Sequence, residues 1–166
     1  MSDNLQNKNS FFIGVISDTH GLLRPEVAEI FKGTDMILHA GDIDRPEVLA
    51  ALREIAPVKA VRGNMDHGKW ADALPAKDVI ELGDVFLYIL HDVYKLDLDP
   101  AAAGFHAVIN GHTHQPLIEK KNGVLFINPG SAGPPRRNYP VSLALLRING
   151  TSPRPEIDAR IVEIEY

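Results

Sequence analysis

The sequence predicts an α/β fold in which two β-sheets pack face to face with helices outside. In the first 64 residues, short apolar runs alternate with amphipathic segments, which indicates a βαβαβ unit with a parallel sheet and right-handed crossovers. After Trp70, pairs of apolar runs flank turn residues instead, as is typical of hairpins. The 166 residues contain no internal repeat and no linker, and this length suits one domain.

The first half begins with the apolar run 11–16, which suits a strand buried on both faces. Residues 24–32 form an amphipathic pattern with Pro25 early in its first turn and Gly33 after its end, so we expect a helix there. A strand over 35–40, a helix over 45–55 and a strand over 58–61 follow. The polar residues 1–10 are expected to form a flexible tail ahead of a single domain over 11–166.

The second half contains two hairpin signals. Strands over 77–82 and 85–90 flank Gly83-Asp84, and strands over 117–121 and 124–127 flank Asn122-Gly123, which is the strongest short hairpin signal. A short buried strand is expected over 107–109, preceded by a helical or loop segment over 99–105. Segments 141–148 and 157–164 are expected to close the fold as an antiparallel pair.

Composition excludes several classes of protein. The formal net charge is −5 and the pI is about 5.8, so no extended nucleic-acid surface is expected. The absence of cysteine excludes disulfides and thiolate zinc sites. No apolar run approaches the roughly 20 residues that span a bilayer, and residues 1–10 lack the apolar core of a signal peptide. We therefore expect a cytoplasmic protein without a membrane association.

Metal-ligating side chains recur directly after the predicted strands. His112 and His114 follow the strand over 107–109 at i and i+2, so both imidazoles can face one site. Taken alone, this pair fits a polar turn equally well. The same pattern recurs at Asp18 and His20, and sites in open α/β sheets form outside the carboxyl ends of strands. The full set of candidate ligands is Asp18, His20, Asp42, Asn64, His91, His112 and His114.

Seven ligands exceed what one ion needs, which is about four to six. Two ions sharing a bridging carboxylate would use all of them, as in sites that clamp both oxygens of an in-line displacement at phosphorus. The mixed nitrogen and oxygen set suits Mn²⁺, Fe, Zn²⁺, Co²⁺ or Ni²⁺ better than Mg²⁺ or Ca²⁺.

The order of these motifs resembles the calcineurin-like metallophosphoesterase superfamily. The resemblance rests on Asp18-Thr19-His20, Gly41-Asp42, Gly63-Asn64, His91 and Gly111-His112-Thr113-His114. The short chain and Asn128-Pro129-Gly130-Ser131 resemble its small bacterial and archaeal phosphodiesterase branch, beside which the retromer subunit of this fold belongs.

The resemblance implies a four-layer α/β/β/α sandwich of the metallo-dependent phosphatase type. It implies that the first metal is held by Asp18, His20 and His114, that the second is held by Asn64, His91 and His112, and that Asp42 bridges them. Asp42, Asn64 and His91 are the expected catalytic residues. A metal-bound hydroxide would attack phosphorus.

The expected function is therefore that of a dinuclear metal-dependent phosphoesterase, most simply a phosphodiesterase acting on a small phosphate ester. Mn²⁺ is the expected metal, with Ni²⁺, Co²⁺, Zn²⁺ or Fe as alternatives. A non-catalytic protein-binding scaffold of the same fold and a phosphomonoesterase or nucleotidase remain alternatives. The oligomeric state is open, with a homodimer or higher homo-oligomer as one possibility, since dimers are the commonest assembly.

Two departures from the family pattern bear on mechanism. Met65 stands where the wider superfamily has a histidine that resembles a general acid, and Asp66 and His67 cannot be assumed to replace it. Where the family commonly has His-Gly-His, this chain has His91-Asp92-Val93. The shape of that loop and one phosphate contact are therefore open.

Several other residues have both a structural and a functional interpretation. His39 fits a core histidine or a residue that orients a ligand. Asn128 and Ser131 fit an ordinary turn or a loop that supports the site. Arg136 and Arg137 fit solvated surface or a phosphate clamp. The remaining candidates are His67 and His106 as surface or loop residues, and Trp70 with Leu74 as a lid, a subunit contact or part of the core.

Overall fold

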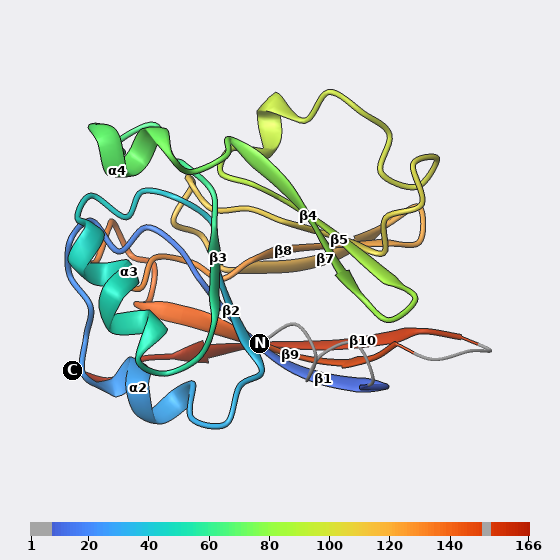
Figure 1. Cartoon of the computed structure of the whole chain (residues 1–166), viewed down its shortest axis with the longest axis horizontal. Coiled ribbons are helices and arrows are strands. Elements are labelled where there is room, and N and C mark those ends of the chain that lie inside the picture. Colours follow the sequence, from blue (N-terminus) through green and yellow to red (C-terminus); the bar gives the residue numbers. More distant parts are fainter. Residues whose placement is uncertain (1–7, 151–153) are drawn as a thin grey trace.

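The computed structural model describes residues 8–150 and 154–166, whose strands form two five-stranded sheets (Figure 1). Sheet A has the order β10-β9-β1-β2-β3, and its strands are β1 (Ser10–Ile16), β2 (Met36–His39), β3 (Val58–Ala60), β9 (Ser142–Asn149) and β10 (Glu156–Glu163). Sheet B has the order β4-β5-β6-β8-β7, and its strands are β4 (Lys77–Leu82), β5 (Val85–Leu90), β6 (Ala107–Ile109), β7 (Leu117–Lys121) and β8 (Val124–Asn128).

The predicted βαβαβ unit forms three of the five strands of sheet A. β1 runs parallel to β2, and β2 runs parallel to β3. The connections contain α2 (Glu26–Ile30) and α3 (Pro46–Arg53), which are shorter than the helices expected from the apolar pattern. The pattern records which side chains face the core, whereas the helix ends where the backbone leaves helical geometry, as it does at Phe31, with φ −88° and ψ 3°.

Sheet B contains both predicted hairpins. β4 pairs antiparallel with β5, and β7 pairs antiparallel with β8. Asn122 and Gly123 between β7 and β8 have φ of 51° and 80°, the positive values that a tight type I′ turn requires. β5, β6 and β8 run parallel to one another. The carboxyl ends of β5 and β6 therefore point to the same edge.

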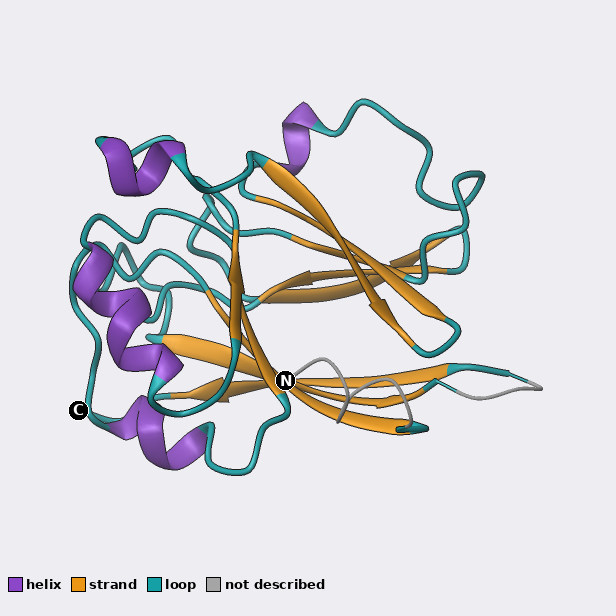
Figure 2. Cartoon of the chain, viewed as in Figure 1, coloured by secondary structure: helices purple, strands orange, loops and turns teal. Residues whose placement is uncertain are grey.

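Three apolar clusters hold the layers together. The largest lies between the sheets and includes the fully buried Ile13, Leu38, Leu87 and Ile109. A second packs α2 and α3 against the outer face of sheet A, and a third covers the outer face of sheet B. Figure 2 shows the helices α2 and α3 beside sheet A and the loop-rich segment above sheet B.

The α/β class with two packed sheets is confirmed, and the outer layer on sheet B is thin. In the described residues that layer is the short 3₁₀-helix η1 (Val93–Lys95) and the chain that follows it, without an α-helix. A short helix, α4 (Lys69–Asp72), precedes β4. Trp70 and Leu74 pack against the cluster under the helices, so they belong to the core.

The expected tail over residues 1–10 lies mostly outside the described residues. Within the described part, Ser10 begins β1 and lies opposite Asn149, and Lys8 forms an ion pair with Asp35. No helix in the described ranges is long and apolar enough to cross a membrane.

Candidate metal centre

All seven predicted ligands lie just beyond the carboxyl ends of strands, where the edges of both sheets meet. Asp18, Asp42 and Asn64 follow successive parallel strands of sheet A, and His20 lies two residues after Asp18. The other three ligands belong to sheet B, since His91 follows β5 while His112 and His114 follow β6. The topology thus brings residues from positions 18 to 114 to one edge.

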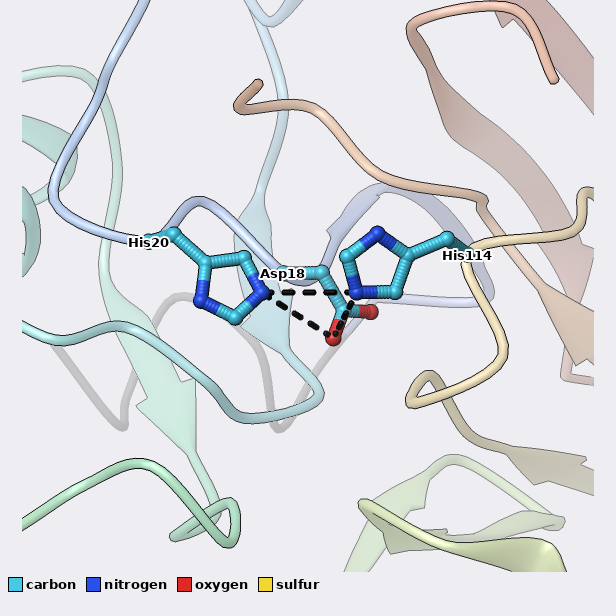
Figure 3. Close-up of side chains that lie close together, drawn as sticks. All are labelled: Asp18, His20 and His114. Atoms are coloured by element: carbon cyan, nitrogen blue, oxygen red, sulfur yellow. Dashed lines mark hydrogen bonds and ion pairs between the residues drawn. The ribbon is translucent and has the colours of Figure 1, made fainter. Parts of the chain in front are cut away.

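One group of three ligands consists of Asp18, His20 and His114 (Figure 3). Asp18 Oδ1 lies 3.4 Å from His114 Nε2 and 3.9 Å from His20 Nε2. The two Nε2 atoms are 3.3 Å apart. Two imidazoles and one carboxylate oxygen therefore converge on one point, with His114 supplied by sheet B and the other two by sheet A.

A second group consists of Asp42, His91 and His112. Asp42 Oδ2 lies 3.3 Å from His91 Nε2, and His91 Nε2 lies 3.3 Å from His112 Nδ1. Asn64 Oδ1 lies 3.2 Å from His112 Nδ1, so the amide oxygen lies beside this group. Sheets A and B again both contribute.

Asp42 lies between the two groups. Its Oδ2 is 3.3 Å from His91 Nε2 in the second group and 3.9 Å from His20 Nε2 in the first. Its Oδ1 accepts a hydrogen bond of 2.9 Å from the Met65 backbone N–H. One carboxylate oxygen is therefore held by the backbone while the other faces both groups, which is the geometry that a bridging ligand needs.

A buried carboxylate oxygen of Asp18 tests whether cations fit here. Oδ2 accepts hydrogen bonds from Ser17 Oγ at 2.7 Å and from the His112 N–H at 3.1 Å. Oδ1 is buried and has no hydrogen-bond donor among the described residues. A buried anionic oxygen without a donor is costly. Its surroundings of imidazole nitrogens fit a divalent transition ion.

The ligand loops are held in sparsely populated backbone conformations. Five of the seven predicted ligands have positive φ, namely Asp18, His20, Asp42, His112 and His114. Positive φ is uncommon outside glycine, although Asp and His adopt it more readily than most residues, and such conformations concentrate at functional sites. The side chains are therefore positioned by the fold itself.

Two glycines permit close approach between these loops. A Cβ on Gly111 would lie 1.9 Å from Ser17 Oγ and 2.7 Å from Asp18 Oδ2. A Cβ on Gly63 would lie 2.2 Å from both the backbone N and Oδ1 of Asp42. Glycine is therefore required in Gly63-Asn64 and in Gly111-His112, because any side chain there would collide with the loop that carries a neighbouring ligand.

Hydrogen bonds orient two of the histidines toward the site. His91 Nδ1–H donates to the Ala40 carbonyl at 2.7 Å, which leaves Nε2 facing Asp42. His20 Nδ1–H donates to Asp44 Oδ2 at 3.2 Å, which leaves its Nε2 facing Asp18. Such partners fix the ring and raise the basicity of the ligating nitrogen.

Charges and burial shift the protonation of the second group. Burial lowers the pKa of His91, but the hydrogen bond with Asp42 and the charges of Asp18 and Asp42 outweigh it, so the pKa is raised above 6.5. Burial raises the pKa of Asp42, but its hydrogen bond with His91, the charge of His91 and the Met65 N–H outweigh it, so the pKa is lowered. Both shifts favour the charged forms, which are protonated His91 and ionised Asp42.

Asp66 is fully engaged by the backbone. Its buried carboxylate accepts four hydrogen bonds of 2.8–3.0 Å from backbone N–H groups. Their donors are Asp42, Ile43, Asp44 and Gly63. Asp66 therefore ties the loop after β2 to the loop after β3, and its oxygens are unavailable as a proton source for a leaving group.

His39 and Asn128 support the loops that carry the ligands. His39 is fully buried, which lowers its pKa to about 3 and keeps the ring neutral. Its Nδ1 accepts from the Gly41 N–H at 3.1 Å, and its Nε2–H donates to Thr19 Oγ1 at 3.0 Å. Asn128 Nδ2 donates to the Gly111 carbonyl and to Thr113 Oγ1, each at 3.0 Å.

A cavity of about 430 Å³ opens onto both groups of ligands, and Met65 and Arg136 line it beside them. Arg137 is exposed and does not line it. His67 is likewise exposed and outside this cavity. His106 lies elsewhere, where its Nδ1 accepts from the Phe86 N–H at 3.0 Å.

Ser131 and Asp92 occupy supporting positions. Ser131 Oγ donates to the Asp18 carbonyl at 2.9 Å. Asp92 accepts from the Tyr94 N–H at 3.0 Å and lies 3.9 Å from His112 Nε2. Asp92 thus caps the N-terminus of η1, and its carboxylate lies near His112 Nε2, the ring nitrogen of His112 other than the Nδ1 that faces His91.

Sequence reasoning missed Asp44 and Ser17. Asp44 stands two residues after Asp42, the same spacing as Asp18 and His20, so this spacing could have drawn attention to it. Ser17 directly precedes Asp18 and carried no distinguishing signal.

Comparison with known proteins gives one consistent result. Residues 11–151 match the calcineurin-like phosphoesterase superfamily domain. A probable metallophosphoesterase of Methanocaldococcus jannaschii is 34% identical over 169 aligned residues, which cover 94% of this chain and 83% of that protein. A phosphodiesterase of the same organism is 30% identical over 137 residues, which cover 71% of this chain and 82% of that protein.

A solved structure has the same fold. Vacuolar protein sorting 29 from Cryptosporidium parvum superposes with a TM-score of 0.73 at 18% identity, over 95% of this chain and 100% of that chain. At this identity the likeness concerns the fold alone. Since the domain match includes both groups of ligands and most of the sequence, the chain belongs to the calcineurin-like phosphoesterase superfamily.

Proposed function

We propose that this protein is a phosphodiesterase that uses two divalent metal ions, with Mn²⁺ as the metal. The observation that carries the proposal is the position of Asp42 Oδ2, which lies 3.3 Å from a histidine nitrogen of one group and 3.9 Å from one of the other. One oxygen shared by two groups of ligands supports two ions held close together. The superfamily is metal-dependent, which agrees with this donor set.

Such ions would activate water and neutralise charge on the phosphoryl oxygens. The protein's own residues would position the ester. The exposed side chains of Asn64 and Arg136 both line the cavity at the metal centre. A guanidinium there can hold a phosphate oxygen through charge-assisted hydrogen bonds.

Two observations favour a diester over a monoester. The cavity of about 430 Å³ at the metal centre and a second cavity share Asn64 and His112 as walls, so a phosphorus at the metals would have room for an alcohol group on either side. A relative 30% identical to this chain is named a phosphodiesterase. We therefore propose a small phosphodiester as the substrate class.

Metal titration with activity measurement tests the proposal. Chelator-stripped protein should bind two Mn²⁺ ions per chain by calorimetry and then hydrolyse bis(p-nitrophenyl) phosphate. Asp42→Ala should lose both properties, whereas Gln115→Ala, an exposed residue just outside the motif, should keep them. Binding of fewer than two ions, or near-normal turnover by Asp42→Ala, would contradict the proposal. A folded protein that binds no metal would support the scaffold alternative instead.

A further inference from the structure

A second cavity of about 520 Å³ lies beside the second group of ligands. It shares the side chains of Asn64 and His112 with the cavity at the metal centre. The two cavities therefore adjoin at these two side chains, beside the metal centre.

Three cationic side chains line this second cavity, and the fold places each near a ligand. Arg62 lies two residues before Asn64, and Lys95 lies four residues after His91. Lys77 is opposite Leu90 in the β4–β5 pairing, and Leu90 directly precedes His91. These residues are far apart in the sequence, and the strand register brings them to one cavity.

These three cationic side chains keep N–H donors available for a bound anionic molecule. Arg62 uses Nη1 to donate to the Leu74 carbonyl at 3.1 Å, which anchors a guanidinium that has further N–H groups. Lys77 pairs with Asp97 at 3.4 Å between exposed side chains, where ion pairs are weak. Lys95 is exposed and has no ion pair among the described residues.

The charge in this cavity is opposite to that of the whole chain. The chain carries a formal net charge of −5, yet the cations number three here against two carboxylates, Asp97, which pairs with Lys77, and Asp92, which lines the cavity. The Asp92 carboxylate already accepts the Tyr94 N–H at 3.0 Å and faces His112. The remaining positive charge favours an anionic ligand group.

We propose that this cavity binds a second phosphate group, carried on one alcohol arm of the substrate. The substrate class is then a phosphodiester that bears an additional phosphate, such as a nucleotide diester with a terminal phosphate. This inference rests on the proposed function, since it assumes that the scissile phosphorus lies at the metals. Lysine and arginine are the side chains that bind phosphate in proteins.

A pair of substrates that differ by one phosphate tests the inference. Thymidine 3′-(p-nitrophenyl phosphate) should be hydrolysed with a kcat/KM about tenfold lower than the same ester carrying a 5′-phosphate, since a charge-assisted hydrogen bond contributes about a factor of ten. In Lys77→Ala/Lys95→Ala the ratio should fall toward one. The matched control Lys120→Ala, an exposed lysine of β7, should keep the ratio of the unmodified protein.

Binding measurements separate the two proposals. Thymidine 3′,5′-bisphosphate should bind the Mn²⁺-loaded protein about tenfold more tightly than thymidine 3′-monophosphate by calorimetry, and the double variant should lose this difference. If both esters are hydrolysed with equal kcat/KM and the bisphosphate binds no more tightly, the cavity proposal is overturned while the phosphodiesterase proposal stands. If neither ester is hydrolysed but the lysine-dependent affinity difference is present, the cavity proposal stands and the proposed catalysis fails.

Discussion

Replacing Asp66 by asparagine tests whether its carboxylate holds together the loops after β2 and β3, which carry candidate metal ligands. The carboxylate accepts two backbone N–H groups on each oxygen, Ile43 and Asp44 on Oδ1 and Asp42 and Gly63 on Oδ2. An amide has the same shape but only one accepting oxygen, and its nitrogen donates. Asp66→Asn therefore loses two of the four hydrogen bonds and places a donor against two buried donors.

The expected loss of stability follows from these two bonds. A hydrogen bond to a charged group contributes about 1.5–3 kcal/mol, so the variant should lose about 3–6 kcal/mol of the free energy of unfolding. Solvent screening reduces this little, because Asp66 is only 4% exposed. A typical domain has about 5–15 kcal/mol in total, so the effect should be large.

Urea unfolding of chelator-stripped protein, followed by circular dichroism, measures the effect. Asp84→Asn is the matched control, since this exposed turn residue has no side-chain hydrogen bond among those described, and it should change stability by no more than about 0.5 kcal/mol. Metal affinity of Asp66→Asn should fall about 10–100-fold, as for other residues that orient ligands. If the free energy of unfolding of Asp66→Asn lies within about 1 kcal/mol of that of the unmodified protein, the stabilising role assigned to the four Asp66 hydrogen bonds is refuted.

Three further predictions concern the same centre. Met65 lines the cavity and cannot donate a proton, so the protein should strongly prefer aryl over alkyl diesters. Met65→His should narrow this difference in kcat/KM by up to the roughly 10²–10⁴-fold that a positioned acid contributes; equal kcat/KM of the unmodified protein for both diesters would contradict this. The pKa of His91 is raised above 6.5, so Mn²⁺ affinity should increase as the pH rises through that raised value, and binding below it should release a proton, as calorimetry in buffers of different ionisation enthalpy would detect. The same shift stabilises the metal-free fold below about pH 6.5, and that contribution is lost as the pH rises through the raised value. Gly111→Ala places a Cβ 1.9 Å from Ser17 Oγ, so it should lower metal affinity, and adding Ser17→Ala should restore part of it; unchanged affinity in the single variant would refute the close packing.

The strands and turns were predictable because their signals are local. A continuous apolar run such as residues 11–16 can only be buried, and Asn122-Gly123 can adopt the positive φ values of a tight turn. The candidate ligands could also be predicted from the sequence, since imidazoles and carboxylates just after strands have a limited range of uses. That they hold metal stays a prediction until the titration is done.

The supporting residues were harder to predict for a physical reason. Asp66 binds backbone N–H groups, which nearly every residue possesses, so no pattern of side chains reveals its partners. The cationic cavity depends on strand register, which places Lys77 beside Leu90 but leaves no mark in the sequence near Arg62 or Lys95. Asn128, which donates hydrogen bonds to Gly111 and Thr113, could be identified only because it belongs to a motif that resembles the family.

Each group of ligands draws on both sheets, and this has a consequence for how the protein reaches its native state. His114 joins two residues of sheet A, and Asp42 joins two histidines of sheet B. Neither sheet alone offers a complete coordination sphere, so an intermediate with undocked sheets would bind an ion weakly. A bound ion would then act as a cross-link that stabilises only the fully assembled chain. Metal occupancy would therefore report on correct docking of the two halves and favour it late in folding.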